Sequence, residues 1–226
     1  MPEKTAITKA IVRYSELHDR FNLTRNNDPM FFSEWHDEDG VALTYAQKDQ
    51  LDFLKQRFIH YLEEDAISEG TVNIIMLAPL INMAGFCDRP YRIKGEQWVK
   101  IKLVLEEDSS ILEGRIDALV VRLINEEKLW LTLIEGKRGG FSVLQAIPQA
   151  LTYMMANPRP NTILFGLVTN GEDYLFLKLN TTDKQYALSQ KFTLVNPDRN
   201  ELYSVLQIMQ RLVQIKSQEY DRYDAA

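Results

Sequence analysis

Apolar residues follow two different spacings along this chain, and the change between them separates helical from extended segments. Apolar positions three or four residues apart predict amphipathic helices, because they fall on one face of a helix. Thr44 and Thr71 are expected to cap two of these helices, Gly85 to end the second, and Pro79 to bend it or delay its start. The helical spacing covers residues 5–21, 45–64, 71–85, 142–155 and 201–218.

A run of strands is predicted in the middle of the chain. Apolar and polar residues alternate there, which is typical of strands with one buried face. Asn170-Gly171 lies between two of the segments and is a strong signal for a tight hairpin. Helices precede, interrupt and follow the strands, so the sequence predicts an α/β (α+β) fold in which helices cover a sheet. The predicted strands are residues 96–106, 111–123, 128–137, 161–170, 173–180 and 186–195.

Length and composition limit the class of protein. The chain has 226 residues, 45% of them apolar, which fits one large domain or one domain with an added element. It contains no long apolar run, and its first residues lack the layout of a signal peptide, so we expect a cytoplasmic protein without a membrane partner. The single Cys87 excludes an internal disulfide and a cysteine zinc cluster.

The overall charge opposes a role in nucleic-acid binding, whereas its distribution favours one. The net charge is −6, and contacts to phosphate normally need positive charge. Basic residues nevertheless crowd the middle third of the chain. They fit either a basic rim around a cluster of carboxylates or an ordinary solvated surface. These residues are Arg89, Arg92, Lys94, Lys100, Lys102, Arg115, Arg122, Lys137, Arg138 and Arg159.

Three charged residues of the second and third strands are predicted to meet. A hairpin centred on Glu126 places Asp117 opposite Glu135, with their backbones about 5 Å apart. Alternation puts Lys137 on the same face as Glu135. Two carboxylates at the edge of a buried face cost several kcal/mol unless a cation or a lysine neutralises them. The same register pairs Leu119 with Leu133 and Val121 with Leu131.

Two residues of the following helix form another candidate element. Gln149 and Tyr153 lie four positions apart, so they share one helix face. Over the sheet they can orient a lysine, a water or a phosphate. The alternative is a partly exposed glutamine beside a packed tyrosine.

These residues and the order of their elements resemble a known superfamily. Asp117, Glu135-Gly136-Lys137 and Gln149-x-x-x-Tyr153 resemble the PD-(D/E)xK nucleases. Within them, the chain is most similar to the nuclease domains of type I restriction enzyme R subunits and of RecB-like nucleases. The segment SEGTVNIIMLAPLINMAGF resembles the opening of the R-subunit domain, with Glu69 at the position of its acid. No proline precedes Arg115-Ile116-Asp117, and Pro148 directly before Gln149 is unusual in the family.

The resemblance implies a fold, a reaction and a set of roles. It implies a restriction-endonuclease-like mixed central sheet in residues 69–180, with a helical extension in 1–68 and a packed strand and helix in 181–226. The implied activity is cleavage of nucleic acid, with DNA preferred, in restriction, defence or DNA processing, and Mg²⁺ or Mn²⁺ is the implied cofactor. Metal ligands would be Asp117, Glu135, the Gly136 carbonyl and Glu69. Lys137, Gln149 and Tyr153 would complete the catalytic set, and Arg115 and Arg138 would contact nucleic acid.

Other readings of the same residues remain open. The protein could keep the nuclease fold and act only as a nucleic-acid-binding or assembly protein, which the net charge and the terminal helices favour. Glu135 and Lys137 could form a surface ion pair that adds little stability. The terminal helices could form a homodimer or simply cap the sheet. The chain has no GxxxxGK[ST] phosphate loop, so the sequence predicts no translocase motor.

Overall fold

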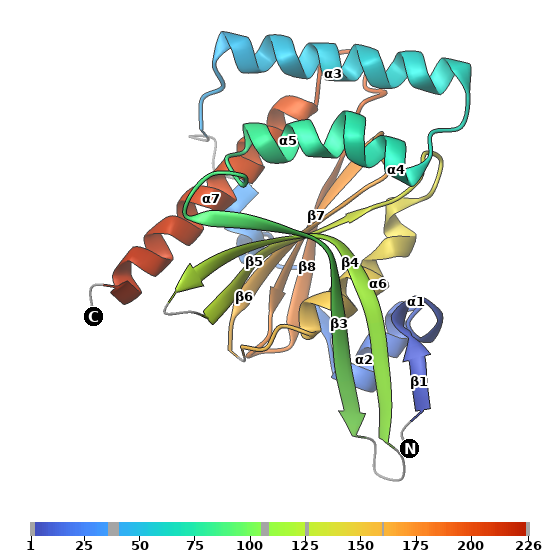
Figure 1. The fold of residues 1–226 in the computed structure, drawn as a ribbon, viewed down its shortest axis with the longest axis vertical. Helices are drawn as coiled ribbons and strands as arrows, with labels where there is room; N and C mark the ends of the chain where they lie inside the picture. The colour runs from blue at the N-terminus through green and yellow to red at the C-terminus, as the bar shows by residue number, and fades with distance from the viewer. Residues whose placement is uncertain (1–2, 36–40, 105–108, 125–126, 160, 225–226) are drawn as a thin grey trace.

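The computed structural model describes residues 3–35, 41–104, 109–124, 127–159 and 161–224 (Figure 1). Within these ranges, the side chains of residues 3, 35, 103, 104, 109, 110, 123, 124, 127–135 and 216–224 lie outside the description. The backbone of Glu135 is therefore described, and its carboxylate is not.

One mixed sheet of eight strands forms the centre of the protein. Seven strands follow one another in the order β1-β4-β5-β6-β7-β8-β2, and β3 pairs with β4 beside them. The pairs β1–β4, β5–β6 and β2–β8 are parallel, and the other neighbours are antiparallel. The strands are β1 Glu3–Ala6, β2 Thr24–Arg25, β3 Tyr91–Val104, β4 Ser109–Ile124, β5 Glu127–Gly136, β6 Ile163–Thr169, β7 Asp173–Asn180 and β8 Gln185–Thr193.

Helices cover both faces of the sheet, which confirms the predicted fold class (Figure 1). On one face, α3 (Tyr45–Glu64), the helix formed by α4 (Glu69–Val72), η2 (Asn73–Leu77) and α5 (Ala78–Met83), and α7 (Leu202–Asp224) bury one apolar cluster. On the other face, α1 (Ile7–Ala10), α2 (Tyr14–Phe21) and α6 (Val143–Met155) bury a second. A 3₁₀ segment, η1 (Pro29–Trp35), follows β2. None of the described helices is long and apolar enough to cross a membrane.

Several local predictions are confirmed. Thr44 caps α3, where its hydroxyl accepts a hydrogen bond from the Gln47 amide at 3.2 Å. The predicted hairpin joins β6 to β7, and Gly171 takes a φ of 87°, which glycine adopts without steric cost. Each signal is contained in a few neighbouring residues, so the sequence alone identifies it.

The single helix predicted for residues 5–21 is wrong. Glu3–Ala6 forms β1, which pairs in parallel with Ser110 to Glu113 of β4, and the chain breaks between the helices α1 and α2. Ile7, Leu17 and Phe21 of the predicted apolar stripe are buried. The apolar spacing was therefore informative, but pairing with a distant strand overrode helix formation at its start. Strands from residues before 69 and after 180 belong to the common sheet, and the proposed division of the chain stays a prediction.

The helix at residues 69–83 differs from the prediction at its N-cap and in the hydrogen bonding before Pro79. Ser68, rather than Thr71, is its N-cap, and the Ser68 hydroxyl accepts from the Thr71 amide at 3.1 Å. Near Pro79, the helix contains a π-helical turn, η2, that ends at Leu77, and the Ala78 amide bonds to the Asn73 carbonyl. A π turn shifts hydrogen bonds by one residue, next to a proline that has no N–H to donate.

The predicted β4–β5 register holds only near the site. Leu119 lies opposite Leu133, as predicted. A β-bulge between Val120 and Val121 then shifts the ladder, so Val121 lies opposite Trp130 and not Leu131. An extra residue in one strand displaces every pair on one side of it.

Candidate active site

The candidate residues gather where strands β4 and β5 separate. On one edge of β4, β1 pairs with residues as far as Glu113, and β5 pairs with residues from Ala118 onward. Along that edge, residues 114–117 have no ladder partner among the described strands. Asp117 therefore lies at the fork, next to the position where β5 ends at Gly136.

The alternation of side chains along β4 is interrupted around Asp117. Ile116 and Leu119 pack into the same apolar cluster, although strict alternation would send them to opposite faces. On the neighbouring strand, Glu96 lies between the pairs Gly95–Ala118 and Gln97–Ile116 and has a left-handed φ of 49°. This local rotation lets the Asp117 side chain reach across the fork instead of packing in either core.

Asp117 is the centre of the site. Its Oδ2 accepts a hydrogen bond from the Gly136 amide at 2.8 Å. Burial has the largest effect on the pKa of Asp117 and raises it, and the nearby Glu69 carboxylate raises it further. The hydrogen bond from Gly136 and the positive charges of Lys137 and Arg115 lower the same pKa. The net direction is upward, because desolvation outweighs the partners. Glu69, Lys137 and Arg115 are thus close enough to act on this carboxylate.

Two contacts between segments place Glu69 and Lys137. Glu69 is the first residue of α4. Two residues before it, the Ile67 carbonyl accepts a 2.8 Å hydrogen bond from the amide of Gly139, in the loop after β5. The Lys137 amide bonds to the Thr169 carbonyl of β6 at 2.7 Å. These bonds hold the entry of α4 and the exit of β5 side by side.

The backbone of Glu135 lies beside the fork. Glu135 pairs with Val168 of β6, while Ile134 pairs with Ala118 of β4. Asp117 on β4 and Glu135 on β5 thus lie directly beyond the last paired residues, Ala118 and Ile134, of the two strands. The Glu135 carboxylate lies outside the described side chains, so its role as a metal ligand stays a prediction.

Gln149 and Tyr153 approach the unpaired edge from the opposite face. Gln149 Nε2 donates to the Tyr153 hydroxyl at 3.0 Å, so the two residues are linked as their spacing suggested. Tyr153 is 1% exposed and packs so tightly on Gly114 that a Cβ there would lie 2.7 Å from its ring. Gly114 belongs to the unpaired stretch that ends at Asp117.

Pro148 does not disrupt this part of α6. Proline removes the hydrogen bond to the carbonyl four residues earlier, here that of Leu144. The Tyr14 hydroxyl of α2 donates to that carbonyl at 3.4 Å. A neighbouring helix thus supplies the donor that Pro148 lacks.

Asn73 is a site residue that sequence reasoning missed. It lies four residues after Glu69, and its side chain occupies the space that a Cβ at Gly136 would fill. Its Oδ1 is buried and has no hydrogen-bond partner among the residues the structure describes. The spacing of one helical turn from Glu69 was the available signal.

The donor chemistry of this corner suits a hard divalent cation. Asp117 and Glu69 both carry carboxylates, and the buried Asn73 oxygen has no hydrogen-bond donor among the described residues. Mg²⁺ and Mn²⁺ bind such oxygens. Among the described side chains, no three His, Cys, Asp or Glu residues come together as a metal-binding group.

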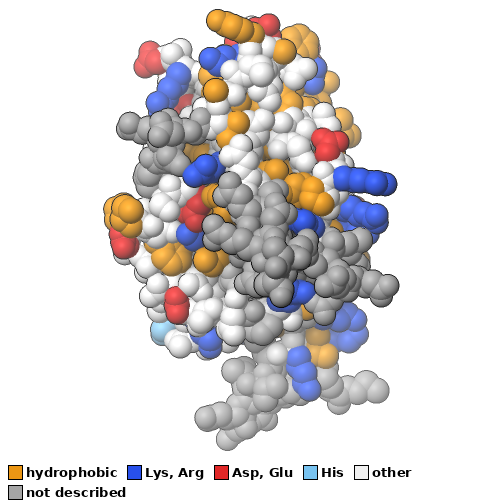
Figure 2. All heavy atoms as spheres, turned by 90° about the vertical axis from the view of Figure 1, so that its left-hand side faces the viewer, with side chains coloured by type: hydrophobic (Ala, Val, Ile, Leu, Met, Phe, Trp, Pro, Cys, Tyr) orange, Lys and Arg blue, Asp and Glu red, His pale blue; other side chains and the backbone are white. Residues whose placement is uncertain are grey.

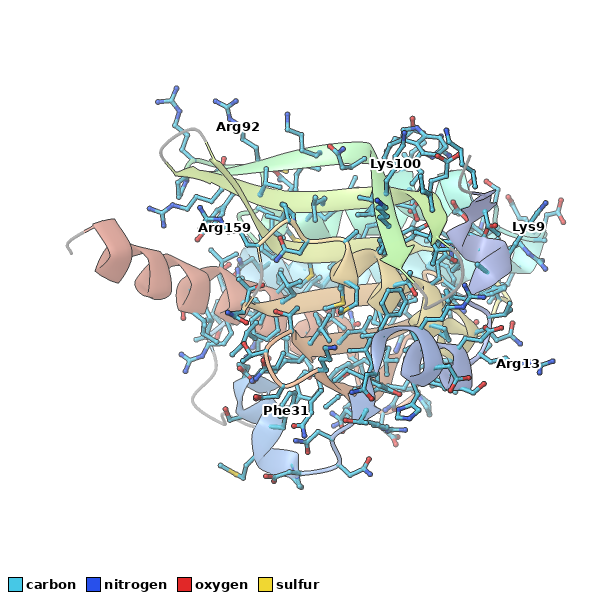
Figure 3. All side chains as sticks on the ribbon, turned by 90° about the horizontal axis from the view of Figure 1, so that it is seen from below. Lys9, Arg13, Phe31, Arg92, Lys100 and Arg159 are labelled. Carbon is cyan, nitrogen blue, oxygen red and sulfur yellow. The ribbon has the colours of Figure 1, made fainter. Side chains whose placement is uncertain are left out.

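The exposed face of β3 carries a basic and aromatic surface. Trp98 is 61% exposed and lies opposite Arg115 of β4, with Lys100 and Lys102 exposed at the next alternate positions. The Arg115 guanidinium forms an ion pair with the Glu96 carboxylate, with 3.4 Å between Nη1 and Oε1. Arg138, directly after Lys137, is exposed. Figure 3 shows Lys100 projecting from this strand, and Figure 2 shows Lys and Arg side chains spread over both halves of the face it presents.

No protein-family model matches this chain, and no curated protein matches it. Among solved structures, the chain is similar to a fragment of a putative HsdR subunit of a type I restriction enzyme from Vibrio vulnificus YJ016. The sequence identity is 18% and the TM-score 0.39, over 65% of this chain and 25% of that chain. At this TM-score the likeness carries no weight for function, which is inferred from the geometry of the site.

Proposed function

We propose that the protein is a metal-dependent nuclease that hydrolyses phosphodiester bonds in DNA, in restriction, defence or DNA processing. The observation that carries the proposal is the position of Asp117. It lies at a fork in the sheet, bonded to the Gly136 amide and within electrostatic range of Glu69 and Lys137. Two opposed carboxylates beside a lysine are costly to fold and useful for phosphoryl chemistry.

Asp117, Glu69, the Gly136 carbonyl and Glu135 would hold Mg²⁺ or Mn²⁺. When bound, such an ion lowers the pKa of a coordinated water and offsets charge on the phosphate. Asp117 is kept in place for this role by the Gly136 amide. Burial raises the pKa of the Asp117 carboxyl, whereas a bound cation would favour its ionised form.

Besides the cation, Lys137 and the Gln149–Tyr153 pair would supply the polar side chains that act on the phosphate and the water. The Lys137 ammonium, next to Asp117, would bind a phosphate oxygen and orient the attacking water. The Tyr153 hydroxyl accepts from Gln149 Nε2, so the two side chains hold each other in position.

The β3 surface would bind the substrate strand. Exposed aromatic rings stack on bases without strong sequence preference, and nearby lysines contact the phosphates. Trp98, with Lys100, Lys102 and Arg115 on the same face of the hairpin, offers both elements. Arg138, exposed after Lys137, would add a phosphate contact near the fork.

Cleavage assays test the proposal directly. Asp117→Ala, Glu135→Ala and Lys137→Ala should each lower Mg²⁺-dependent DNA cleavage by about 10²-fold or more, because each removes a group that acts on the phosphate or the water. Asp19→Asn, an exposed acid on α2, is the control and should cleave normally. Cleavage that persists in chelator, or in all three variants, would contradict the mechanism. Metal-independent DNA binding without cleavage would favour a binding protein on this fold.

Titration of labelled DNA, followed by fluorescence anisotropy of the label, tests the β3 surface. Trp98→Ala should weaken binding of single-stranded DNA by about 1–3 kcal/mol, since it removes a stacking platform. Lys100→Gln should reduce the salt dependence of binding by about one phosphate contact. Exposed Lys184, on the turn between β7 and β8, is the matched control as Lys184→Gln. Equal affinity of Trp98→Ala and wild type would place the nucleic acid elsewhere.

A further inference from the structure

Among the residues that the structure describes, none donates a hydrogen bond to the buried amide oxygen of Asn73. Most buried polar atoms are hydrogen-bonded, because a buried polar atom without a partner loses its hydrogen bonds to water and gains none in exchange. Asn73 Oδ1 is buried and without a partner among the described residues. A side chain retained at such a position needs a reason beyond packing.

The position of this oxygen supplies that reason. Asn73 follows Glu69 by one helical turn and lies against Gly136, the residue whose amide binds Asp117. The oxygen therefore shares a corner with Glu69, one helical turn before it, and with Asp117, which accepts from the Gly136 amide. Asn73 also begins the π turn η2, an irregularity that is frequent at functional sites.

We propose that Asn73 supplies a further, neutral oxygen to the divalent-cation site of Asp117 and Glu69, either directly or through one bound water. The inference rests on the proposed function. An amide oxygen suits Mg²⁺ or Mn²⁺ and adds no charge. A carboxylate at position 73 would instead add a third negative charge beside Asp117 and Glu69. The missing side chain at Gly136 leaves the space that this oxygen occupies.

The competing explanation is purely structural. The oxygen could accept a weak hydrogen bond from the Gly136 Cα and fix the helix against β5. The two explanations differ in what Asn73 does before a cation is added. A structural Asn73 stabilises the protein in chelator, whereas an oxygen reserved for a cation does not.

Titration of Mn²⁺ and Mg²⁺ into the full chain without nucleic acid tests the proposal. Asn73→Ala should bind Mn²⁺ about 10-fold more weakly in calorimetry, the loss expected for an auxiliary group at a metal site. Its Tm in chelator should equal or exceed that of wild type, since the variant removes an unsatisfied buried oxygen. The rise in Tm on adding Mn²⁺ should shrink. Asn82→Ala, an exposed asparagine on α5, is the matched control and should bind like wild type.

Asn73→Asp keeps an oxygen at the site and guards against failure of the alanine variant to fold. It should retain Mn²⁺ binding and lower the Tm in chelator, because it adds a negative charge near Asp117 and Glu69. Unchanged Mn²⁺ affinity in Asn73→Ala, or loss of binding in Asn73→Asp, would overturn this inference and leave the proposed nuclease intact. Failure of wild type to bind either cation would overturn both.

Discussion

Two helices press a polar side chain against a glycine of the sheet from opposite faces. From η2, Asn73 lies against Gly136 at the end of β5, and from α6, Tyr153 lies against Gly114 of β4. The glycines stand on either side of the fork that holds Asp117. In both places a side chain larger than hydrogen would keep the helix away from the sheet.

The two contacts differ in how completely they are satisfied. On the α6 side, Gln149 donates to Tyr153, and Tyr14 donates to the carbonyl that Pro148 leaves without its helical partner. On the η2 side, the buried Asn73 oxygen has no described partner, and the pKa of Asp117 is raised. The polar groups on the α6 side have described hydrogen-bond partners, whereas the η2 side contains the polar groups that the proposed cation would bind.

Alanine at each glycine tests this difference with the largest expected effect on stability. Gly114→Ala should destabilise the fold by about 1–3 kcal/mol, because the buried Tyr153 ring has no room to move. Gly136→Ala should cost less, since the overlapping atom is the end of the Asn73 side chain. Urea unfolding measures both variants.

A double variant sharpens the result. Adding Asn73→Ala to Gly136→Ala should recover most of the lost stability, because the overlapping oxygen is removed. If Gly136→Ala proves as costly as Gly114→Ala and Asn73→Ala does not rescue it, the two contacts are equally rigid. The proposed contrast between the two sides would then be incorrect.

The pH dependence of stability probes the η2 side. The folded-state pKa of Asp117 is raised above its unfolded value, so the folded protein binds the extra proton between the two. The contribution of Asp117 to stability therefore falls as pH rises from the ordinary aspartate pKa of about 3.9 toward the folded value, and stays low above it. In chelator at pH 7, Asp117→Asn should have a higher Tm than wild type, and the difference should vanish in acid.

Saturating Mn²⁺ should reverse that order, because the cation stabilises ionised Asp117 in wild type alone. Asp173→Asn is a suitable comparison, since Asp173 lies on β7, two strands away from β5, and forms an ion pair with Lys191 at 2.9 Å. A Tm of Asp117→Asn below that of wild type in chelator would show that the carboxylate is already well compensated.

Tyr153→Phe tests the α6 side and should have the smallest effect on folding. It removes the hydrogen bond from Gln149 and keeps the ring against Gly114, so it should cost about 0.5–1.5 kcal/mol. Mn²⁺ affinity should be unchanged, while DNA cleavage falls. Reduced Mn²⁺ affinity in calorimetry would mean that both helices, and not only the one with Asn73, support the cation.

The sequence by itself determined the features that depend on neighbouring residues. Apolar spacing and the Thr44 cap predicted α3, alternation predicted the central strands, and Asn170-Gly171 predicted the β6–β7 hairpin. Residue identity also selected Asp117, Glu69 and Lys137, which the structure brings near one another. Turn and cap signals are local, because their hydrogen bonds join residues a few positions apart.

Only the tertiary structure decided how those elements meet. Pairing of Glu3–Ala6 with β4 turned the start of a predicted helix into β1, and the bulge after Val120 changed the register near the hairpin turn. The fork at Asp117 exists because β1 and β5 share one edge of β4 and leave residues 114–117 between them. The unsatisfied oxygen of Asn73 depends on contact with Gly136, a residue 63 positions away in the sequence. Such contacts join distant segments, and their free energy depends on packing that no local pattern specifies.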